Sequence, residues 1–591
     1  MIRSVGIDLG TSNTLVYQFG FAAGTTYDPP SSIRIFYEDE CGFPSLSGDW
    51  KFPSVLYLKE TGEEIRPYVG AVAEILIANN PGCSEARLFN TKRLMGNSDE
   101  LKLAHGYTAE KVAEEFYRCC GNSLMHSQYF RTKRQWNQIQ HICITRPAAF
   151  DPYGVNETIN AATKAMCEIA NAVTKDALPA PVPKIEVLKE PQAALLTFLY
   201  ECLNDPEAED ELLRRQNKRD GILRVAVVDI GGGTTDVSVQ MLSVSGDHGD
   251  KTEEDDYIAG SEYATNYVIQ FINSEMKDGS RSHFNPLRHF GGLDFDAEAA
   301  KHLIERLDEQ CRTNGFDIYA LSDDEKMHIR NIAMMEAKSF KDSPQVVNGA
   351  WMPKLDFVGY DRTVIVSYRQ EEYDAWVSDL IGSSRRPHRL DQYNKPCPTI
   401  YSIIADTLRN ANLQPSDLDY MYVTGGMSLY PPVYRMLQEE FGAQTKMVRS
   451  SVNALNDIAM GASLFNTYFQ VKQDVSNLEE NLMLDLPEGE PVILAQAGKP
   501  LPQEKTIEFP LANPVEIALD ILMGPDPLSP DLHKIKMLRA QIPMTRIGTP
   551  VELRFKIPRE QSIHIALCVK SEVEPFEIPI DTSFGQNIAG V

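Results

Sequence analysis

Two short stretches of the chain share one pattern. Residues 5–14 read "VGIDLGTSNT", and residues 227–236 read "VVDIGGGTTD". In each stretch an apolar run ends in an aspartate, which is followed by glycines and then by small hydroxyl residues. The two aspartates, Asp8 and Asp229, lie far apart in the chain. The repeat leaves three possibilities open: two nucleotide sites, one site built from two halves, or coincidence.

The composition of these turns suits phosphate groups. A glycine-rich turn after a buried strand lets backbone N–H groups approach phosphate oxygens, because no Cβ stands in the way. Thr11, Ser12, Thr234 and Thr235 add hydroxyl donors, and an aspartate at the strand end can hold water around Mg²⁺. The GxGxxG fingerprint is absent, which disfavours a dinucleotide-binding oxidoreductase. The GxxxxGK[ST] phosphate-binding loop is absent too. Two such turns favour a duplicated fold that grips one nucleotide from both sides.

The bulk composition narrows the class of protein. The chain has 591 residues, too many for one hydrophobic core, and 43% of them are hydrophobic. The formal net charge of −26 argues against nucleic-acid or membrane-surface binding, which need clustered positive charge. The ten cysteines form no CxxC pair, so free thiols are expected rather than disulfides or a metal framework. Without a signal peptide or an apolar run long enough to cross a membrane, we expect a cytoplasmic protein.

Strand-like and helix-like patterns alternate up to about residue 470, as in α/β architecture. Five apolar runs end at turn signals as buried strands do: "VGIDL", "HICIT", "IEVL", "VAVVDI" and "YMYVTGG". Apolar residues at helical spacing predict a helix over 155–169. A second helix is expected to begin at Pro431 in "PPVYRMLQEEFG".

The pattern changes near the end of the chain, where the hydrophobic period becomes two. Ile517, Leu519 and Ile521 alternate with polar residues, and residues 551–557 do the same. This alternation predicts half-buried strands. We therefore expect a nucleotide-binding region over 1–470, a linker over 471–490 and a small β domain over 491–591.

Two polar stretches look like surface insertions. Residues 204–219 read "NDPEAEDELLRRQNKR", and residues 246–257 read "GDHGDKTEEDDY". Both lack a continuous apolar stripe, so we expect solvated loops. Docking of a basic partner is the functional alternative.

A resemblance follows from further motifs. A third glycine turn stands in "VTGGMSLYPP", where Gly425 and Gly426 could lie against a sugar or purine ring. With the two repeated turns, it resembles the actin, sugar kinase and heat-shock superfamily. Six more stretches resemble consecutive landmarks of the seventy-kilodalton heat-shock chaperones of DnaK type: "FPSVLYL", "NTKRLMG", "CITRPAAFDP", "VLKEPQAALL", "GGLDFD" and "MGAS". The resemblance covers most of residues 2–470 and weakens through the insertions and much of 297–420. It implies a duplicated, two-lobed ATPase domain around a nucleotide cleft, followed by a β-sandwich.

The resemblance also implies roles for individual residues. Lys92 matches the lysine that positions the attacking water, Glu190 matches the carboxylate near the metal, and Pro147 matches an allosteric relay proline. The implied catalytic set is Lys92, Glu190, Asp8, Asp229 and Thr234. The implied nucleotide-binding set is Gly10, Thr11, Ser12, Gly231, Gly232, Gly233, Thr234, Lys338, Gly425, Gly426 and Leu429. Mg²⁺ would be held by Asp8, Asp229 and Asp236, with ATP or ADP as the nucleotide and K⁺ as a further candidate ion.

The adenine end departs from the family. Members commonly clamp adenine between two arginines, but Leu429 and Ser339 stand at the matching positions. Stacking of a guanidinium on an aromatic ring contributes roughly 0.5–2 kcal/mol. We therefore expect weaker nucleotide binding, or binding supported by apolar contacts from Leu429 and Tyr430.

The C-terminal region departs further. "LMLDL" (482–486) resembles the hydrophobic linker that docks on the ATPase domain, with an apolar interdomain strand as the alternative. The following strands resemble the substrate-binding β-sandwich. The family's helical lid is expected to be missing, because the chain stops at "FGQNIAGV".

The leading hypothesis is an ATP-hydrolysing chaperone whose nucleotide state controls a protein- or peptide-binding β domain, with a J-domain protein or an exchange factor as possible partners. The alternative is a dedicated switch or assembly factor that serves one complex. A small-molecule kinase fits the landmarks poorly, and the appended β domain argues against an actin-like filament.

Overall fold

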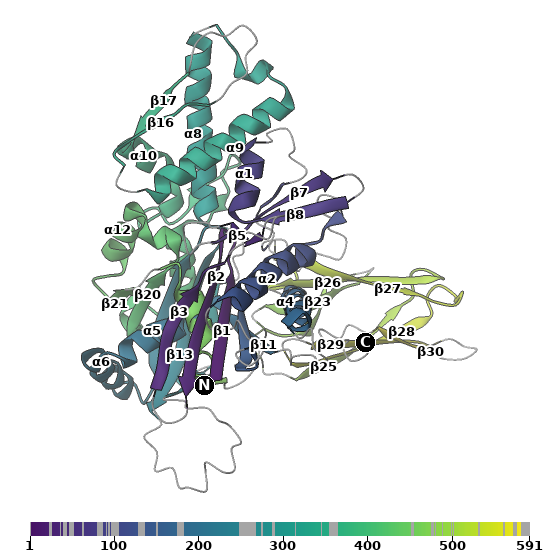
Figure 1. Cartoon of the computed structure of the whole chain (residues 1–591). Coiled ribbons are helices and arrows are strands. Elements are labelled where there is room, and N and C mark those ends of the chain that lie inside the picture. The colour runs from purple at the N-terminus through teal and green to yellow at the C-terminus, as the bar shows by residue number, and fades with distance from the viewer. Residues whose placement is uncertain are drawn as a thin grey trace.

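The computed structural model is a mixed α/β molecule with several sheets (Figure 1). It describes residues 2–22, 26–35, 37–38, 44–45, 52–61, 64–79, 87–89, 92, 95, 106–127, 136–148, 152–173, 183–246, 267–272, 276–285, 290–313, 315–343, 346–353, 364–450, 454–473, 478, 480–486, 489–497, 499, 502–529, 532–559, 562–570 and 576–580. Among the helices it describes, none is long and apolar enough to cross a bilayer. The five strands expected from apolar runs are all present.

The first quoted stretch forms a hairpin at the centre of a sheet. In this sheet β1 pairs antiparallel with β2 and parallel with β10, in the order β11-β10-β1-β2-β3, and β6 pairs with β2. Its strands are β1 (Ile2–Leu9), β2 (Asn13–Ala22), β3 (Thr26–Ile33), β6 (Phe52–Pro53), β10 (Ile139–Arg146) and β11 (Lys184–Lys189). Asp8 therefore ends a central strand, opposite Leu15.

The second stretch forms a hairpin in a sheet with the same arrangement. Here β12 pairs antiparallel with β13 and parallel with β20, in the order β21-β20-β12-β13-β14-β22, and β15 pairs with β13. Its strands are β12 (Leu223–Ile230), β13 (Thr235–Gly246), β14 (Tyr267–Ile272), β15 (His283–Phe284), β20 (Tyr420–Thr424), β21 (Lys446–Arg449) and β22 (Phe469–Gln473). In both sheets two parallel strands lie on one side of the first hairpin strand, and the second hairpin strand pairs antiparallel on its other side, so one strand topology occurs twice.

Two helices, α5 (Glu190–Leu203) and α13 (Asp457–Leu464), join the sheets through a shared core. Their close approach depends on glycine, because a Cβ on Gly461 would lie 1.8 Å from Ala193 O. Likewise, a Cβ on Gly6 in β1 would lie 2.2 Å from Ala459 O. The two sheets are thus held together behind the ends of their central strands.

The outer faces of the sheets are covered by further helices and small sheets. On the first sheet, α2 (Ala109–His126) and α4 (Pro152–Val173) share a core with α1 (Ala71–Asn79) and the strands β7 (Val55–Thr61) and β8 (Glu64–Val69). The strand β9 (Arg87–Phe89) pairs with β7. The core on the second sheet includes α8 (Gly292–Thr313), α9 (Asp323–Asp342), α10 (Gln370–Ile381), α11 (Ile400–Asn410), α12 (Pro431–Glu440), β16 (Asn348–Trp351) and β17 (Val366–Arg369). Short pieces complete the described elements: β4 (Tyr37–Glu38), β5 (Pro44–Ser45), β18 (Arg389–Leu390), β19 (Pro396–Cys397) and 3₁₀ turns at Ile318–Ala320, Pro415–Asp417 and Gly426–Leu429. The helices expected over 155–169 and from Pro431 are confirmed as parts of α4 and α12.

One expected loop is a helix. Residues 204–219 contain α6 (Pro206–Asn217), where Asp205 caps the first turn by accepting hydrogen bonds from Glu207 N (3.0 Å) and Ala208 N. Gln216 fixes the other end, because its side chain donates to Val244 O and accepts from Val244 N. The prediction of a loop was wrong here, since end caps and one buried face are enough to hold a largely polar helix. The second insertion, beyond Gly246, lies outside the described residues.

The C-terminal strands pack as two facing sheets, and they project to one side of the molecule in Figure 1. One sheet has the order β24-β23-β26-β27 and the other β25-β28-β29-β30. The strands are β23 (Asn481–Asp485), β24 (Val492–Ala495), β25 (Gln503–Pro510), β26 (Glu516–Gly524), β27 (His533–Gln541), β28 (Pro550–Arg559), β29 (Ser562–Val569) and β30 (Phe576–Ile580). The alternating residues Ile517, Leu519 and Ile521 are buried in the shared core, as their period of two predicts.

The "LMLDL" stretch lies inside this β region. Leu482, Met483 and Leu484 are buried in β23, which pairs with β24 and β26. Leu482 and Leu484 contribute to the core shared by the two facing sheets, so the stretch is an apolar strand of the β region. Its role as a linker stays a prediction. Residues 471–473 of the expected linker belong to β22 of the second sheet. The boundaries of the three regions stay predictions.

Candidate functional site

A cleft between the two large sheets collects almost every predicted site residue. Its lining includes Asp8, Gly10, Thr11, Ser12, Lys92, Glu190, Asp229, Gly231, Gly232, Gly233, Thr234, Lys338, Gly425, Gly426 and Leu429. Asp236 is not part of this lining, but it is buried beside Glu190 and Asp229. Residues that are distant in the sequence thus meet in one place.

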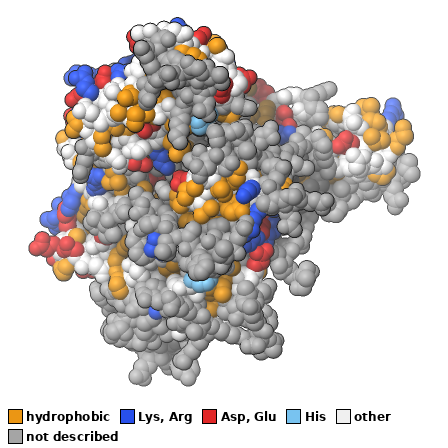
Figure 2. Space-filling model, turned by 45° about the horizontal axis from the view of Figure 1, so that its top comes forward, with side chains coloured by type: hydrophobic (Ala, Val, Ile, Leu, Met, Phe, Trp, Pro, Cys, Tyr) orange, Lys and Arg blue, Asp and Glu red, His pale blue; other side chains and the backbone are white. Residues whose placement is uncertain are grey.

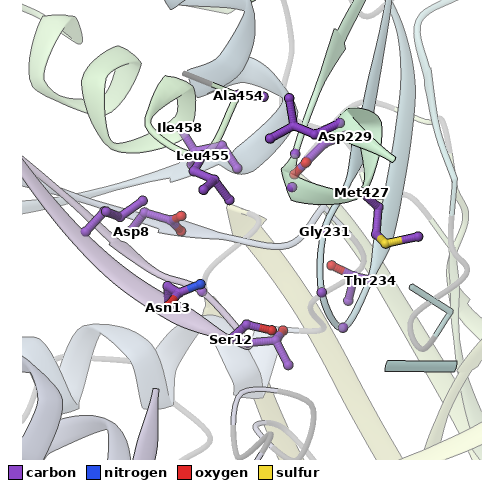
Figure 3. A pocket seen from close by; sticks show the side chains of 18 of the residues that line it. Asp8, Ser12, Asn13, Asp229, Gly231, Thr234, Met427, Ala454, Leu455 and Ile458 are labelled. Atoms are coloured by element: carbon purple, nitrogen blue, oxygen red, sulfur yellow. The ribbon is translucent and has the colours of Figure 1, made fainter. Parts of the chain in front are cut away.

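The two glycine-rich turns have the same geometry. Gly10 N donates to Asn13 O at 3.0 Å, and Gly231 N donates to Thr234 O at 2.9 Å. In Figure 3, Asp8, Ser12 and Asn13 lie on one side of the cleft, and Asp229, Gly231 and Thr234 lie on the other. Each turn follows the strand that carries its aspartate. The turn of each hairpin therefore lines the same cleft.

The two turns approach each other closely at two glycines. A Cβ on Gly232 would lie 2.0 Å from Ser12 Oγ, and a Cβ on Gly233 would lie 2.3 Å from Thr11 Cγ2. A Cβ at either position would therefore force the facing side chain, Ser12 or Thr11, to move. The hydroxyl groups of one turn therefore face the bare backbone of the other, an arrangement that lets both approach the same phosphate chain.

A buried cation stands among the carboxylates. Lys92 is 8% exposed and forms an ion pair with Glu190, the first residue of α5. Lys92 Nζ also lies 3.9 Å from Asp8 Oδ1, and this oxygen accepts a hydrogen bond from Thr145 Oγ1 at 2.8 Å. Residues from four separate segments therefore hold the ammonium and fix Asp8.

Carboxylates outnumber cations in this cluster, and the pKa values respond to that excess. Burial raises the pKa of Glu190 to about 8, Lys92 opposes the shift, and Asp236 and Asp8 add to it. Burial, together with neighbouring carboxylates, also raises the pKa of Asp229 well above its usual range. For Lys92, burial lowers the pKa, but Glu190 and Asp8 outweigh burial and the pKa is raised. The site therefore favours added positive charge, as a proton or as a metal ion.

The donor set fits a divalent cation. Carboxylate oxygens of Glu190, Asp229 and Asp236 lie within 4.8 Å of one another. Two of these residues each have one buried carboxylate oxygen, Asp229 Oδ1 and Asp236 Oδ2, without a hydrogen-bond partner in the described part of the chain. Mg²⁺ prefers oxygen ligands and would satisfy both. This trio includes Glu190 in place of the expected Asp8, whose role as a ligand stays a prediction.

The third turn packs directly against Asp229. Gly425 has a φ of +83°, and a Cβ there would lie 2.2 Å from Asp229 Oδ1, so both its conformation and its space require glycine. Asp457 supports the preceding strand, because it accepts hydrogen bonds from Tyr422 and Thr424. The Gly425–Gly426 turn thus borders the same cleft as the two glycine-rich turns.

The far end of the cleft is apolar on one side and charged on the other. Leu429, 41% exposed, lines it together with Met427 and Tyr430. Tyr430 is almost fully buried and donates to Asp374, so its hydroxyl is already engaged. Ser339, aligned with the missing first arginine, is exposed on α9 and is not part of the lining.

The sequence did not assign three charged residues that line this end: Asp296, Lys341 and Asp342. Lys341 and Asp296 are both buried, and Lys341 Nζ donates to Asp296 Oδ1 at 2.6 Å. Asp296 lies in the quoted "GGLDFD" motif, and Lys341 follows Lys338 by three positions on α9, which places both on one helix face. The three-residue spacing from Lys338 was the feature of the sequence from which Lys341 could have been predicted to line the cleft.

Pro147 is buried directly after β10 and is not part of the described cleft lining. Arg146 Nη1 donates to Pro147 O at 3.2 Å. Its role as a relay stays a prediction. The eight cysteines that the structure describes are all free thiols, as their spacing indicated.

Comparison with known proteins gives one consistent result. No protein-family model matches the chain. The chain is 22% identical to the chaperone protein DnaK of Mycoplasmopsis pulmonis, with 94% of this chain and 74% of the relative covered. It is 22% identical to DnaK of Thermosipho africanus (95% and 77% covered) and 24% identical to DnaK of Deinococcus deserti (99% and 80% covered). Over most of its length the chain is therefore similar to DnaK-type heat-shock chaperones, as its motifs indicated.

Proposed function

We propose that the chain binds and hydrolyses ATP in the cleft between the two sheets, and that its nucleotide state controls protein binding by the β region. The observation that carries the proposal is the buried Lys92–Glu190 pair, set among Asp8, Asp229 and Asp236 where the two glycine-rich turns meet. A cation next to carboxylates at the end of a phosphate-binding turn is the combination that phosphoryl transfer to water needs.

Each residue has a separate task in this scheme. The backbone N–H groups of the two turns bind the phosphates, with Thr11, Ser12 and Thr234 adding hydroxyl donors. Lys92 orients the attacking water and balances charge at the terminal phosphate. Glu190, Asp229 and Asp236 would hold Mg²⁺, directly or through water, and the bound ion would neutralise phosphate charge. Asp8, which accepts a hydrogen bond from Thr145, orients water on the side of the cleft opposite Asp229.

The β region supplies a surface for a protein client. Hydrophobic side chains are visible on this projecting part in Figure 2. Met544 is 87% exposed and Ile547 is 61% exposed, and Val515 beside them is also exposed. Backbone hydrogen bonds from Ile542 N to Val515 O (2.9 Å) and from Thr545 N to Pro514 O (2.8 Å) hold the two loops together. Exposed apolar groups on an ordered rim are suited to an apolar protein segment.

Release of inorganic phosphate from Mg²⁺–ATP tests the proposal. The wild-type chain should hydrolyse ATP, and Lys92→Ala should bind ATP but hydrolyse it at least about 100-fold more slowly, because it lacks the positioned cation. Lys326→Ala, a change at the surface of α9, serves as the matched control and should hydrolyse normally. Hydrolysis by Lys92→Ala at the wild-type rate would contradict the proposal.

Stimulation of ATP turnover, together with partner binding by the Lys92→Ala variant, distinguishes two cellular roles. A general chaperone, acting in the cytoplasm with a J-domain protein and an exchange factor, should show turnover stimulated by peptides or a J-domain. A dedicated switch or assembly factor should show neither effect, and Lys92→Ala should instead retain one stoichiometric partner in the presence of ATP.

A further inference from the structure

The buried pair of Lys341 and Asp296 stands at a junction of three elements. Lys341 lies near the end of α9, and Asp296 lies in the first turns of α8. Lys341 Nζ donates to Asp296 Oδ1 at 2.6 Å and to Gly292 O at 3.0 Å, and Lys341 is 8% exposed. Both charged residues line the nucleotide cleft. The pair therefore belongs to the wall of the site rather than to the core behind it.

The start of α8 connects this pair to the second phosphate turn. Gly292 N donates to Gly231 O at 3.0 Å, and Leu293 N donates to Gly232 O at 2.6 Å. A Cβ on Gly291 would lie 2.8 Å from Thr234 N. The first turn of α8 thus packs against the glycine-rich turn, and Lys341 holds the carbonyl group of Gly292 in that contact.

The third element is the Gly425–Gly426 turn. A Cβ on Gly292 would lie 3.0 Å from both Lys341 Nζ and Met427 Cγ. Met427 follows Gly426 directly and lines the cleft beside the second turn (Figure 3). The ammonium group therefore sits between the turn that faces the phosphates and the turn that faces the sugar and base.

An ammonium group carries three N–H donors. In the described part of the chain, Gly292 O and Asp296 Oδ1 accept two of them, which leaves one for a ligand in the cleft. Burial raises the pKa of Asp296 to about 6, with Lys341 opposing the shift. At neutral pH Asp296 is therefore ionised and anchors the ammonium group.

We propose that Lys341, anchored by Asp296, binds the nucleotide phosphate nearest the sugar. This inference rests on the proposed function and names a contact that supplements the apolar adenine end. A charged hydrogen bond at this position would hold the nucleotide next to Leu429, where the family's arginine is missing. Asp296 acts as a positioning residue, since it contacts the ammonium group and not the ligand.

Binding of ADP, AMP and adenosine, each displacing a fluorescent ADP analogue at pH 7.5, tests the proposal. Lys341→Met should weaken ADP and AMP alike by about 10-fold or more, since a hydrogen bond to a charged group contributes about 1.5–3 kcal/mol. Adenosine lacks phosphate, so its affinity should change less than about twofold. Lys326→Met on the exposed face of α9 should leave all three affinities unchanged.

Two results for Lys341→Met would overturn the proposal. They are an equal loss for adenosine, or unchanged affinity for AMP. Lys341→Arg covers the case in which the methionine variant does not fold: it keeps the charge and should retain most of the AMP affinity, whereas equal losses for AMP and adenosine would contradict the assignment. If the wild-type chain binds no nucleotide at all, the proposed function itself fails, and the Lys341 assignment falls with it.

Discussion

Replacing Glu190 with glutamine should flatten the dependence of the protein's stability on pH. Burial raises the pKa of Glu190 from its ordinary 4.5 to about 8. Between about pH 4.5 and pH 8 the folded protein therefore binds this proton more tightly than the unfolded chain does, although Lys92 favours the ionised carboxylate with which it pairs. Stability consequently falls as pH rises from about 4.5 to about 8, and it levels off above that range.

The size of the effect follows from the shift. Each unit of pH within the window costs about 1.4 kcal/mol for one group, so ionisation of Glu190 between pH 6 and pH 8 lowers the free energy of unfolding by about 2–3 kcal/mol. Asp229 and Asp236 have raised pKa values too, so some dependence on pH should persist without Glu190. Glutamine keeps the shape of the side chain and has no carboxyl group to ionise.

Urea unfolding at pH 6 and pH 8 measures this difference. Between the two pH values, Glu190→Gln should lose about 2–3 kcal/mol less than the wild-type protein. Glu504→Gln, at an exposed glutamate of β25, is the control and should behave as the wild type. Saturating Mg²⁺ should also flatten the wild-type dependence, because the ion would replace the proton. Equal dependence on pH in the wild type and Glu190→Gln would refute the account of a crowded, buried carboxylate cluster.

Three further predictions concern the ends of the site and the client surface. Leu429→Arg should strengthen ATP binding by about 2- to 30-fold, because a guanidinium stacked on adenine contributes roughly 0.5–2 kcal/mol. If calorimetry shows no gain in ATP affinity, the missing arginine does not explain weak binding at the adenine end. Gly232→Ala should weaken ADP binding by more than about 10-fold, because its methyl group would meet Ser12 Oγ in the cleft, while the melting temperature changes little. Unchanged ADP affinity would mean that close contact between the two glycine-rich turns is not needed for binding. Met544→Asp should reduce binding of a permanently unfolded model protein but leave basal ATP hydrolysis intact, as measured by fluorescence anisotropy and phosphate release; undiminished client binding would place the client elsewhere.

The sequence predicted the two glycine-rich turns best, because their pattern is local. Glycines and hydroxyl residues of a turn follow one another in the chain, so the turns at Gly10 and Gly231 are recognisable from the order of residues alone. The central strands ended where their apolar runs ended, since a buried strand must be apolar throughout. Lys92 and Glu190 required the family resemblance, because nothing in their own neighbourhoods shows that they form an ion pair.

Other features depended on long-range packing. Lys341 and Asp296 pair across two helices, and neither position shows in the sequence that the other will face it. The helix α6 was not predicted for a different reason: Asp205 and Pro206 form a recognisable helix start, but the polar sequence that follows them lacks the continuous apolar stripe from which a helix is usually predicted. The "LMLDL" strand shows what an apolar run leaves open. Such a run predicts that its side chains are buried, but not which part of the protein they pack against.

Calorimetric titration of the chain with ADP in the presence of Mg²⁺ tests the central claim, that the two glycine-rich turns build one site. We predict one ADP per chain, and loss of that binding in Asp8→Asn and in Asp229→Asn alike, because each variant removes a carboxylate from one side of the same cleft. Two ADP molecules per chain, or a single variant that still binds ADP as the wild type does, would contradict the shared site.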